Sequence, residues 1–257
     1  MEHKRHLFIP VFLFISVSIS GQESKNHEMV FPRGISLMYG KSMTSMRDEY
    51  ISPETYTGNL NCITASWSWF KNNKGYRVGI SNNFSNEVRN NDILADYNQT
   101  MLFLDFMYDA GKFSIFSKDA YLYIGPSLEL FDYYMNHSFA NIIKSESEGS
   151  LTSLGVNINL LWQINNWVQP ELFLRSNLLS FANKTYDNQR YPNSNSEASL
   201  VSFFDANNIH SGLGIRFFPF NKFSIKVDYK LHYSKISEWD DYSSVNNIIS
   251  ATANYTF

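Results

Sequence analysis

The residues of this sequence that could do chemistry are charged side chains that recur at every second position inside apolar segments. The clearest set is Lys226, Asp228, Lys230 and His232, which alternate with Val, Tyr and Leu. Because successive side chains of a β-strand point to opposite faces, all four residues would share one face of a strand. Opposite charges on one face can pair, and a histidine can bind a metal ion or exchange a proton near neutral pH.

Period-two alternation is the dominant pattern of the chain. Leu154, Val156, Ile158, Leu160 and Trp162, for example, alternate with glycine, asparagine and leucine. Most of these segments run about 11–15 residues, whereas average globular strands have about 5–6 residues and membrane-spanning strands about 9–11. We count ten such segments, at 33–43, 59–71, 74–86, 96–109, 119–135, 150–164, 167–181, 206–219, 222–235 and 245–257.

The connections between these segments alternate in length. Those at 71–74, 165–166 and 220–221 are short, and 110–118, at the same end, is somewhat longer. Long polar connections lie at the opposite end, and short periplasmic turns with long extracellular loops are typical of outer-membrane barrels. The predicted long loops are 44–58, 87–95, 136–149, 182–205 and 236–244.

Residues 1–20 have the pattern of a secretory signal peptide. A basic stretch at 3–6 precedes an apolar run at 7–19, and small residues stand before Gly21. This order of basic, apolar and small residues is typical of an export signal that is cleaved. We therefore expect a single outer-membrane β-barrel domain over 21–257.

The fold class predicted is all-β, an antiparallel transmembrane up-and-down β-barrel of about ten strands. Eight strands are the alternative if the first and fifth segments are misread, and a secreted β-sandwich would alternate in the same way. Aromatic residues at the ends of apolar faces favour the barrel, because membrane barrels carry aromatic girdles at both interfaces. These residues are Trp67, Trp69, Trp162, Phe217, Tyr255 and Phe257.

The last segment has a distinctive end, with Ile249, Ala251, Ala253, Tyr255 and Phe257 on one face. It resembles the terminal strand of bacterial outer-membrane β-barrel proteins, and the whole chain resembles the small Asn- and Tyr-rich barrels of Bacteroidota-type bacteria, without matching a specific member. The resemblance implies location in the bacterial outer membrane, exported by an N-terminal signal peptide. It also implies insertion by the barrel-assembly machinery through Tyr255 and Phe257, and contact with outer-membrane lipid and lipopolysaccharide.

A ten-stranded barrel is only slightly wider than an eight-stranded one, whose interior is filled by side chains. Both signs of charge occur on the inward face, so we expect ion pairs that fill the lumen; a narrow charge-lined pore is the alternative. The predicted lumen cluster consists of Arg77, Asp105, Glu129, Glu171, Arg175, His210, Arg216, Lys226, Asp228, Lys230 and His232.

The two histidines of this cluster can be placed by the turn that precedes the ninth segment. A tight turn at 219–221 puts His210 opposite Lys230 and His232 opposite Asn208, with the histidines as diagonal neighbours. No third ligand accompanies them, so we predict lumen filling and no metal site.

Enzyme functions are the less favoured alternative. Ten-stranded outer-membrane proteases place acidic residues and a histidine at the outer rim, but no pair of loop acids is fixed here by spacing. A lipid A deacylase needs a serine bonded to a histidine, and adjacent strand residues such as His210 and Ser211 point to opposite faces. We therefore predict no catalytic residues and no cofactor.

Function is predicted only in general terms. The barrel would be a structural protein or a narrow small-solute channel with a charged, largely plugged lumen, and a monomer. The alternative is a surface binding, adhesion or secretion-partner module that acts through loops 136–149 and 182–205, with Phe139, Tyr186 and Tyr191. A net charge of −3 argues against a nucleic-acid partner, which would call for a basic surface.

Overall fold

The computed structural model describes residues 33–49, 52–71, 73–90, 93–139, 143–186, 197–220, 222–237 and 241–257. Over these residues the chain consists of strands and turns, and no helix is long and apolar enough to cross a membrane. The predicted signal peptide at 1–20 lies outside the described residues.

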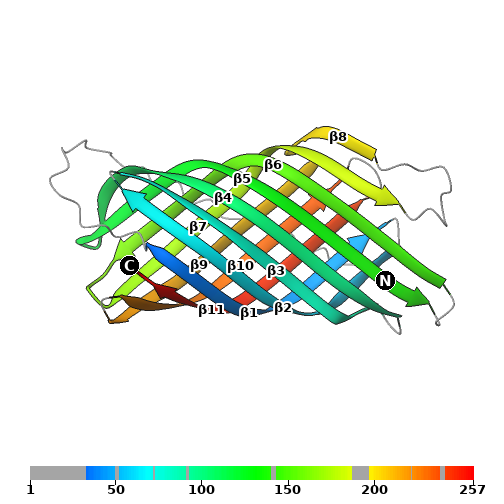
Figure 1. Cartoon of the computed structure of the whole chain (residues 1–257), viewed down its shortest axis with the longest axis horizontal. Coiled ribbons are helices and arrows are strands. Elements are labelled where there is room, and N and C mark those ends of the chain that lie inside the picture. Colours follow the sequence, from blue (N-terminus) through cyan, green and yellow to red (C-terminus); the bar gives the residue numbers. More distant parts are fainter. Residues whose placement is uncertain are drawn as a thin grey trace, which may run out of the picture.

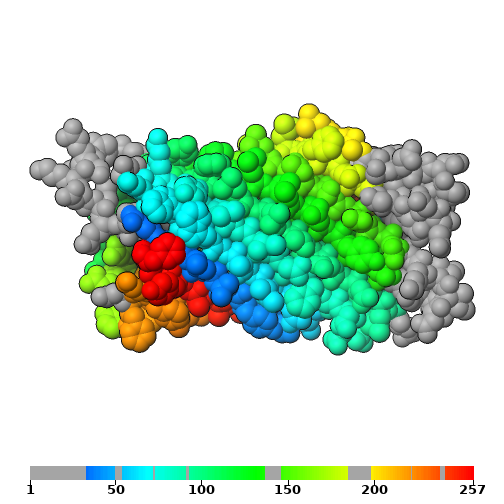
Figure 2. Space-filling model, viewed as in Figure 1, coloured from blue at the N-terminus to red at the C-terminus, as the bar shows by residue number. Residues whose placement is uncertain are grey.

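The described residues form one closed antiparallel sheet, in the order β6-β5-β4-β3-β2-β1-β11-β10-β9-β7, which the pairing of β6 with β7 closes (Figure 1). The first and last strands, β1 and β11, lie side by side in the wall (Figure 2). The strands are β1 (Gly34–Asp48), β2 (Ser52–Lys71), β3 (Lys74–Asn90), β4 (Ile93–Ile115), β5 (Lys118–Phe139), β6 (Ile143–Gln163), β7 (Val168–Tyr186), β8 (Glu197–Ser202), β9 (Ala206–Phe220), β10 (Phe223–Ile236) and β11 (Tyr242–Tyr255).

Strand β8 does not add an eleventh position to the wall. It pairs with residues 179–184 of β7, and β9 pairs with 168–176 of the same strand. Strands β8 and β9 therefore follow one another along one side of β7, separated by a turn at 203–205. The barrel has the ten strands expected from the sequence, and the eight-strand alternative is wrong.

The strands are longer than predicted at the long-loop end. Strand β5 reaches Phe139 and β6 begins at Ile143, so most of the predicted loop 136–149 is strand. Strand β7 continues to Tyr186, and β8 occupies part of the predicted loop 182–205. The prediction was wrong here because the polar and apolar faces exchange sides in these strand ends, which made them look like polar loops.

The exchange is plain on β5. Leu128 and Leu130 face outward while Glu129 is buried in the barrel; further along, Phe131 and Tyr133 are buried and Asp132 faces outward. Side chains still point alternately inward and outward, so the strand is regular. What changes along it is which face carries the apolar side chains.

The connection at 110–118 was expected to be longer than the other short turns. Strands β4 and β5 instead continue to Ile115 and Lys118, and only Phe116 and Ser117 connect them. Both residues have positive φ, 48° and 60°, as a two-residue type I′ hairpin turn requires. The extra length is absorbed in β4, where the pairing register shifts between Asp109 and Gly111.

Candidate functional site in the barrel lumen

The interior of the barrel is layered along its axis. A packed apolar core fills the long-loop half, and a smaller cluster of Phe70, Met107, Tyr121, Tyr123 and Leu161 lies near the short turns. Between them the inward positions carry the charged side chains of the predicted lumen cluster. The structure places all eleven residues of the predicted lumen cluster on the inner face, either buried or lining an internal cavity.

The first of two ion-pair networks is centred on Asp105 of β4, which is fully buried. Its carboxylate accepts hydrogen bonds from Arg77 Nη2 at 2.8 Å and from Arg175 Nη2 at 2.6 Å. Arg175 Nη1 also lies 3.6 Å from a Glu129 carboxylate oxygen, which is 3.3 Å from His210 Nε2. Two arginines and two carboxylates from four strands thus tie the wall together across the lumen.

The second network joins β7, β9 and β10. Glu171 accepts a hydrogen bond from Arg216 Nε and lies 3.2 Å from Lys226 Nζ. Asp228 is 3.1 Å from Lys226 and 3.5 Å from Lys230, so these three residues form a ladder along one face of β10.

Glu171 and Arg175 both stand on β7, but they pair with different partners across the lumen. Glu171 belongs to the network with Arg216 and Lys226, and Arg175 to that with Asp105 and Glu129. Four residues along a strand separate the two side chains by more than the reach of an ion pair, whereas neighbouring strands bring partners together.

A third buried ion pair was missed by the sequence analysis. Lys184 Nζ lies 3.1 Å from Asp48, and both side chains are almost fully buried. The Tyr133 hydroxyl donates to the same carboxylate at 3.2 Å, and the Ser147 hydroxyl at 2.5 Å. Both charged residues fall in segments predicted to be loops; extending the alternation of the flanking strands would have shown that they face inward.

The two histidines are direct cross-strand partners, and the predicted diagonal arrangement is wrong. Phe223 pairs with Phe220 where β9 and β10 meet, and a register shift between Phe223 and Ile225 then moves the pairing by one residue. His232 therefore lies opposite His210, and their rings stack at 3.9 Å between centroids. His232 Nε2 is 2.6 Å from Asn208 Oδ1.

This pair has no further ligand set around it. Over the described residues, no group of three or more His, Cys, Asp or Glu side chains is arranged to hold a metal ion. His210 lies beside Glu129, and Phe131 packs edge-on against His232 with ring centroids 5.8 Å apart. The histidines therefore sit where the charged layer meets the apolar core.

The apolar core closes the lumen on the long-loop side. Tyr133 and Tyr242 stack with centroids 3.7 Å apart and planes 8° apart, and the Tyr97 and Tyr242 hydroxyls are 2.8 Å apart. The buried side chains of this core come from most strands of the wall. Its large members are Met46, Tyr56, Leu60, Tyr97, Phe131, Tyr133, Met135, Leu151, Ile236 and Tyr242.

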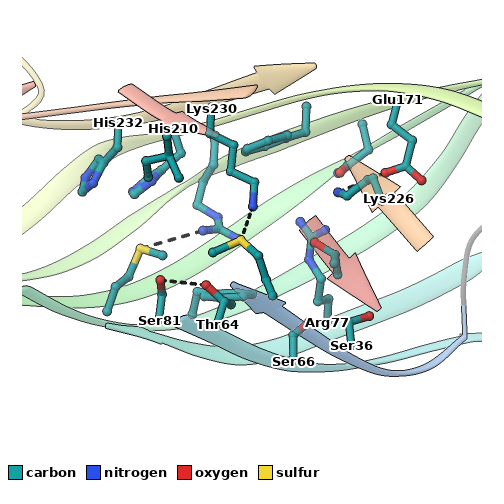
Figure 3. A pocket seen from close by; sticks show the side chains of 18 of the residues that line it. Ser36, Thr64, Ser66, Arg77, Ser81, Glu171, His210, Lys226, Lys230 and His232 are labelled. Atoms are coloured by element: carbon teal, nitrogen blue, oxygen red, sulfur yellow. Dashed lines mark hydrogen bonds and ion pairs between the residues drawn. The ribbon is translucent and has the colours of Figure 1, made fainter. Parts of the chain in front are cut away.

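A cavity of about 150 Å³ remains in the charged layer. Figure 3 shows Lys230 and Lys226 reaching into it from one side, with Arg77, Ser36, Thr64, Ser66 and Ser81 on the opposite side. This cavity has room for water or a small solute.

Some of the acids near the long-loop end, and the neighbours His210 and Ser211, lie within the described residues. Asp96 faces outward on β4, and Asp205 accepts a hydrogen bond from Ser202 within its own turn. His210 points inward, whereas Ser211 is on the outward face of β9. Tyr191 and the acids Asp92, Asp187, Glu238 and Asp240 lie outside the described residues.

Comparison with known proteins shows the fold. No family model matches this chain, and no curated protein does. The outer membrane protease OmpT from Escherichia coli is similar with a TM-score of 0.53 and 10% identity, over 87% of this chain and 95% of that one. At this identity the likeness shows a shared ten-strand barrel and nothing about activity.

Other solved structures match this chain with lower TM-scores. The attachment invasion locus protein Ail of Yersinia pestis matches with a TM-score of 0.32 and 13% identity, over 87% of this chain and 99% of that one. An outer membrane channel from Pseudomonas putida F1 matches with a TM-score of 0.36 and 8% identity, over 92% and 100%. These structural neighbours are bacterial outer-membrane β-barrels with different tasks.

Proposed function

We propose that this chain is an integral protein of the bacterial outer membrane whose lumen is closed, so that it acts as a structural, surface-presenting barrel and not as a channel. The observation that carries the proposal is the exchange of polar and apolar faces halfway along the strands. One half of the barrel is mainly apolar outside and charged inside, and the other half is mainly polar outside and mainly apolar inside.

The first half suits a lipid environment. Exposed apolar side chains face outward in a continuous band, as membrane barrels require. Exposed aromatic residues, including Trp69, Tyr108, Trp167, Phe217, Phe220, Tyr255 and Phe257, lie at its short-turn edge. The band covers 35–39 of β1, 63–69 of β2, 76–80 of β3, 102–108 of β4, 122–130 of β5, 154–162 of β6, 168–174 of β7, 213–217 of β9, 225–231 of β10 and 249–255 of β11.

The second half suits water. Polar and charged side chains face outward there and the packed core fills the inside, as in a water-soluble β-protein. Solute passing through the lumen would have to cross this core, which speaks against the small-solute channel. The outward polar residues include Thr57, Asn59, Asn82, Asp96, Asn98, Asp132, Glu148, Ser150 and Thr152.

The remaining parts of the proposal follow from the sequence. Residues 1–20 would direct export, and the barrel-assembly machinery would read Tyr255 and Phe257, which both project outward and are exposed. Outer-membrane lipid and lipopolysaccharide would surround the band, and the barrel would be a monomer of the small Bacteroidota-type kind.

Single-channel recording in a planar bilayer tests the closed lumen. We expect the refolded wild-type chain to insert and give no discrete current steps, because the apolar core interrupts the water path. Folding is verified by heat-dependent gel mobility of the same sample. Reproducible unitary steps from the folded protein would overturn the closed-barrel function and restore the channel.

A surface binding module is the second candidate, and exposed apolar residues around β8 favour it. Phe204 is 85% exposed and Leu200 68% exposed, and Phe181 stands directly opposite Leu200 on β7. Its cross-strand neighbour on β6 is the outward-facing Thr152, which belongs to the polar half. Exposed apolar side chains that gather on a mainly polar surface are typical of contact sites for other proteins.

A photo-activated cross-linking residue placed at position 204 tests this candidate in intact cells. We expect a discrete adduct with one protein from position 204, and none from Lys222, which is exposed at the short-turn end. Absence of an adduct from position 204, or the same adducts from both positions, would reject the binding module.

A further inference from the structure

The charges on the wall of the lumen cavity do not balance. Among the described residues, five cationic side chains and one acidic side chain, that of Glu171, line the cavity. His210 and His232 stand at the edge next to the apolar core. The cationic residues are Arg77, Arg175, Arg216, Lys226 and Lys230.

The other carboxylates of the two networks lie behind this wall and are shared between cations. Asp105 accepts hydrogen bonds from both arginines of its network, and Asp228 is near both lysines of β10. Glu171 is itself held by Arg216 and Lys226. The positive charge that faces the cavity is therefore only partly compensated.

Lys230 is the cation with the weakest set of partners. Its ammonium group is 3.5 Å from Asp228 Oδ1, an atom that also accepts a hydrogen bond from Ser250. Its other contact is the sulfur of Met38, which is a weak acceptor. The side chain keeps 20% of its surface accessible, and that of Arg77 keeps 23%.

Arg77 also has donors to spare. Its hydrogen bonds to Asp105 use Nε and Nη2, whereas a guanidinium group carries five N–H donors. Ser81, on the same strand as Arg77, accepts a hydrogen bond from Thr64 at 2.9 Å, which leaves the Ser81 hydroxyl proton for a ligand. Charged and neutral donors thus converge on one space (Figure 3).

We propose that this cavity binds a small oxyanion, with inorganic phosphate or sulfate as the type, held by Lys230, Lys226 and Arg77 and by hydroxyl groups of β2 and β3. Burying uncompensated charge is costly, and an anion at this place would remove that cost. The cavity has room for several water molecules and so for an ion of this size. Because the larger apolar core closes the long-loop side, we expect the ion to exchange at the short-turn end, past the smaller cluster of Phe70, Met107, Tyr121, Tyr123 and Leu161.

Isothermal titration calorimetry of the refolded barrel in uncharged detergent, with inorganic phosphate as the probe, tests the site. We expect saturable binding at one site, and a Kd raised by about tenfold or more in Lys230→Met, since hydrogen bonds to charged groups are among the stronger ones. Lys235→Met, on the outward face of the same strand, should leave the Kd unchanged. Equal Kd values in wild type and Lys230→Met would overturn the site.

The wild-type measurement decides the matter even if Lys230→Met fails to refold. Phosphate should raise the unfolding temperature of the wild-type barrel above that in chloride of equal ionic strength, and sulfate should compete with phosphate in the titration. A wild-type titration without saturable heat, together with equal unfolding temperatures in both salts, would overturn the oxyanion site. Neither result depends on whether the barrel conducts ions or binds a surface partner.

Discussion

At the scale of single residues, the interior of this barrel is held by charged side chains, most of which pair with an opposite charge on another strand. Asp105 joins β4 to β3 and β7, and Asp48 joins β1 to β7. The Asn157 side chain does similar work without charge. Its amide donates to the carbonyl oxygens of Phe106, Gly125 and Pro126, next to the position where proline offers no N–H to the ladder.

The pair of Lys184 and Asp48 gives a residue-scale prediction. Lys184→Met leaves the Asp48 carboxylate buried without its cation, and we expect a loss of about 3–5 kcal/mol in the free energy of unfolding. Lys112→Met, in the exposed pair with Asp119, should cost about 1 kcal/mol or less. Urea unfolding of the refolded barrel, followed by tryptophan fluorescence, measures both. Similar losses of unfolding free energy in the two variants would contradict the conclusion that the buried pair stabilises the long-loop half of the barrel.

At the scale of the element, each strand carries two patterns in series. On β6 the outward positions are apolar from Leu154 to Trp162 and polar from Glu146 to Thr152. The boundary between the two patterns marks where the lipid band ends, because a polar outward side chain is costly in hydrocarbon and cheap in water.

Arginine placed on the two sides of this boundary tests it. Ile158→Arg lies in the middle of the apolar run of β6, and we expect it to cost about 2–4 kcal/mol of unfolding free energy in lipid vesicles. Ser150→Arg, eight residues away on the same outward face, should be nearly neutral. Equal tolerance of arginine at positions 158 and 150 would contradict the assignment of the band to lipid.

At the scale of the whole molecule, one closed sheet has two halves along the barrel axis, and the halves differ in what fills them and in what they expose. The half with the lipid band is filled by ion pairs and keeps a cavity, and the half with the long loops is filled by an apolar core. β8 and the C-terminus lie toward opposite ends of the barrel (Figure 1). A closed lumen and an exposed rim follow from this arrangement, and a silent bilayer recording is its expected consequence.

Much of this architecture could be predicted from the residues alone. The ten strands, the antiparallel barrel and the inward direction of the charged side chains all depend on period-two alternation, which is local along the chain. Residues such as Lys226, Asp228 and Lys230 occupy one face of β10 whatever their neighbours are. The strand ends were underestimated, because a polar outward face at the long-loop end has the composition of a loop.

What only the tertiary structure decided is which strands meet, in which register, and what fills the space between them. A register shift near Phe223 puts His210 opposite His232, and no pattern within either strand encodes that shift. The partners of Asp105 and the pairing of Asp48 with Lys184 join residues 28 to 136 positions apart. Alternation determines the face of a strand on which a side chain lies, whereas closure of the sheet determines the residue that it meets, because closure adds up the register of every strand around the barrel.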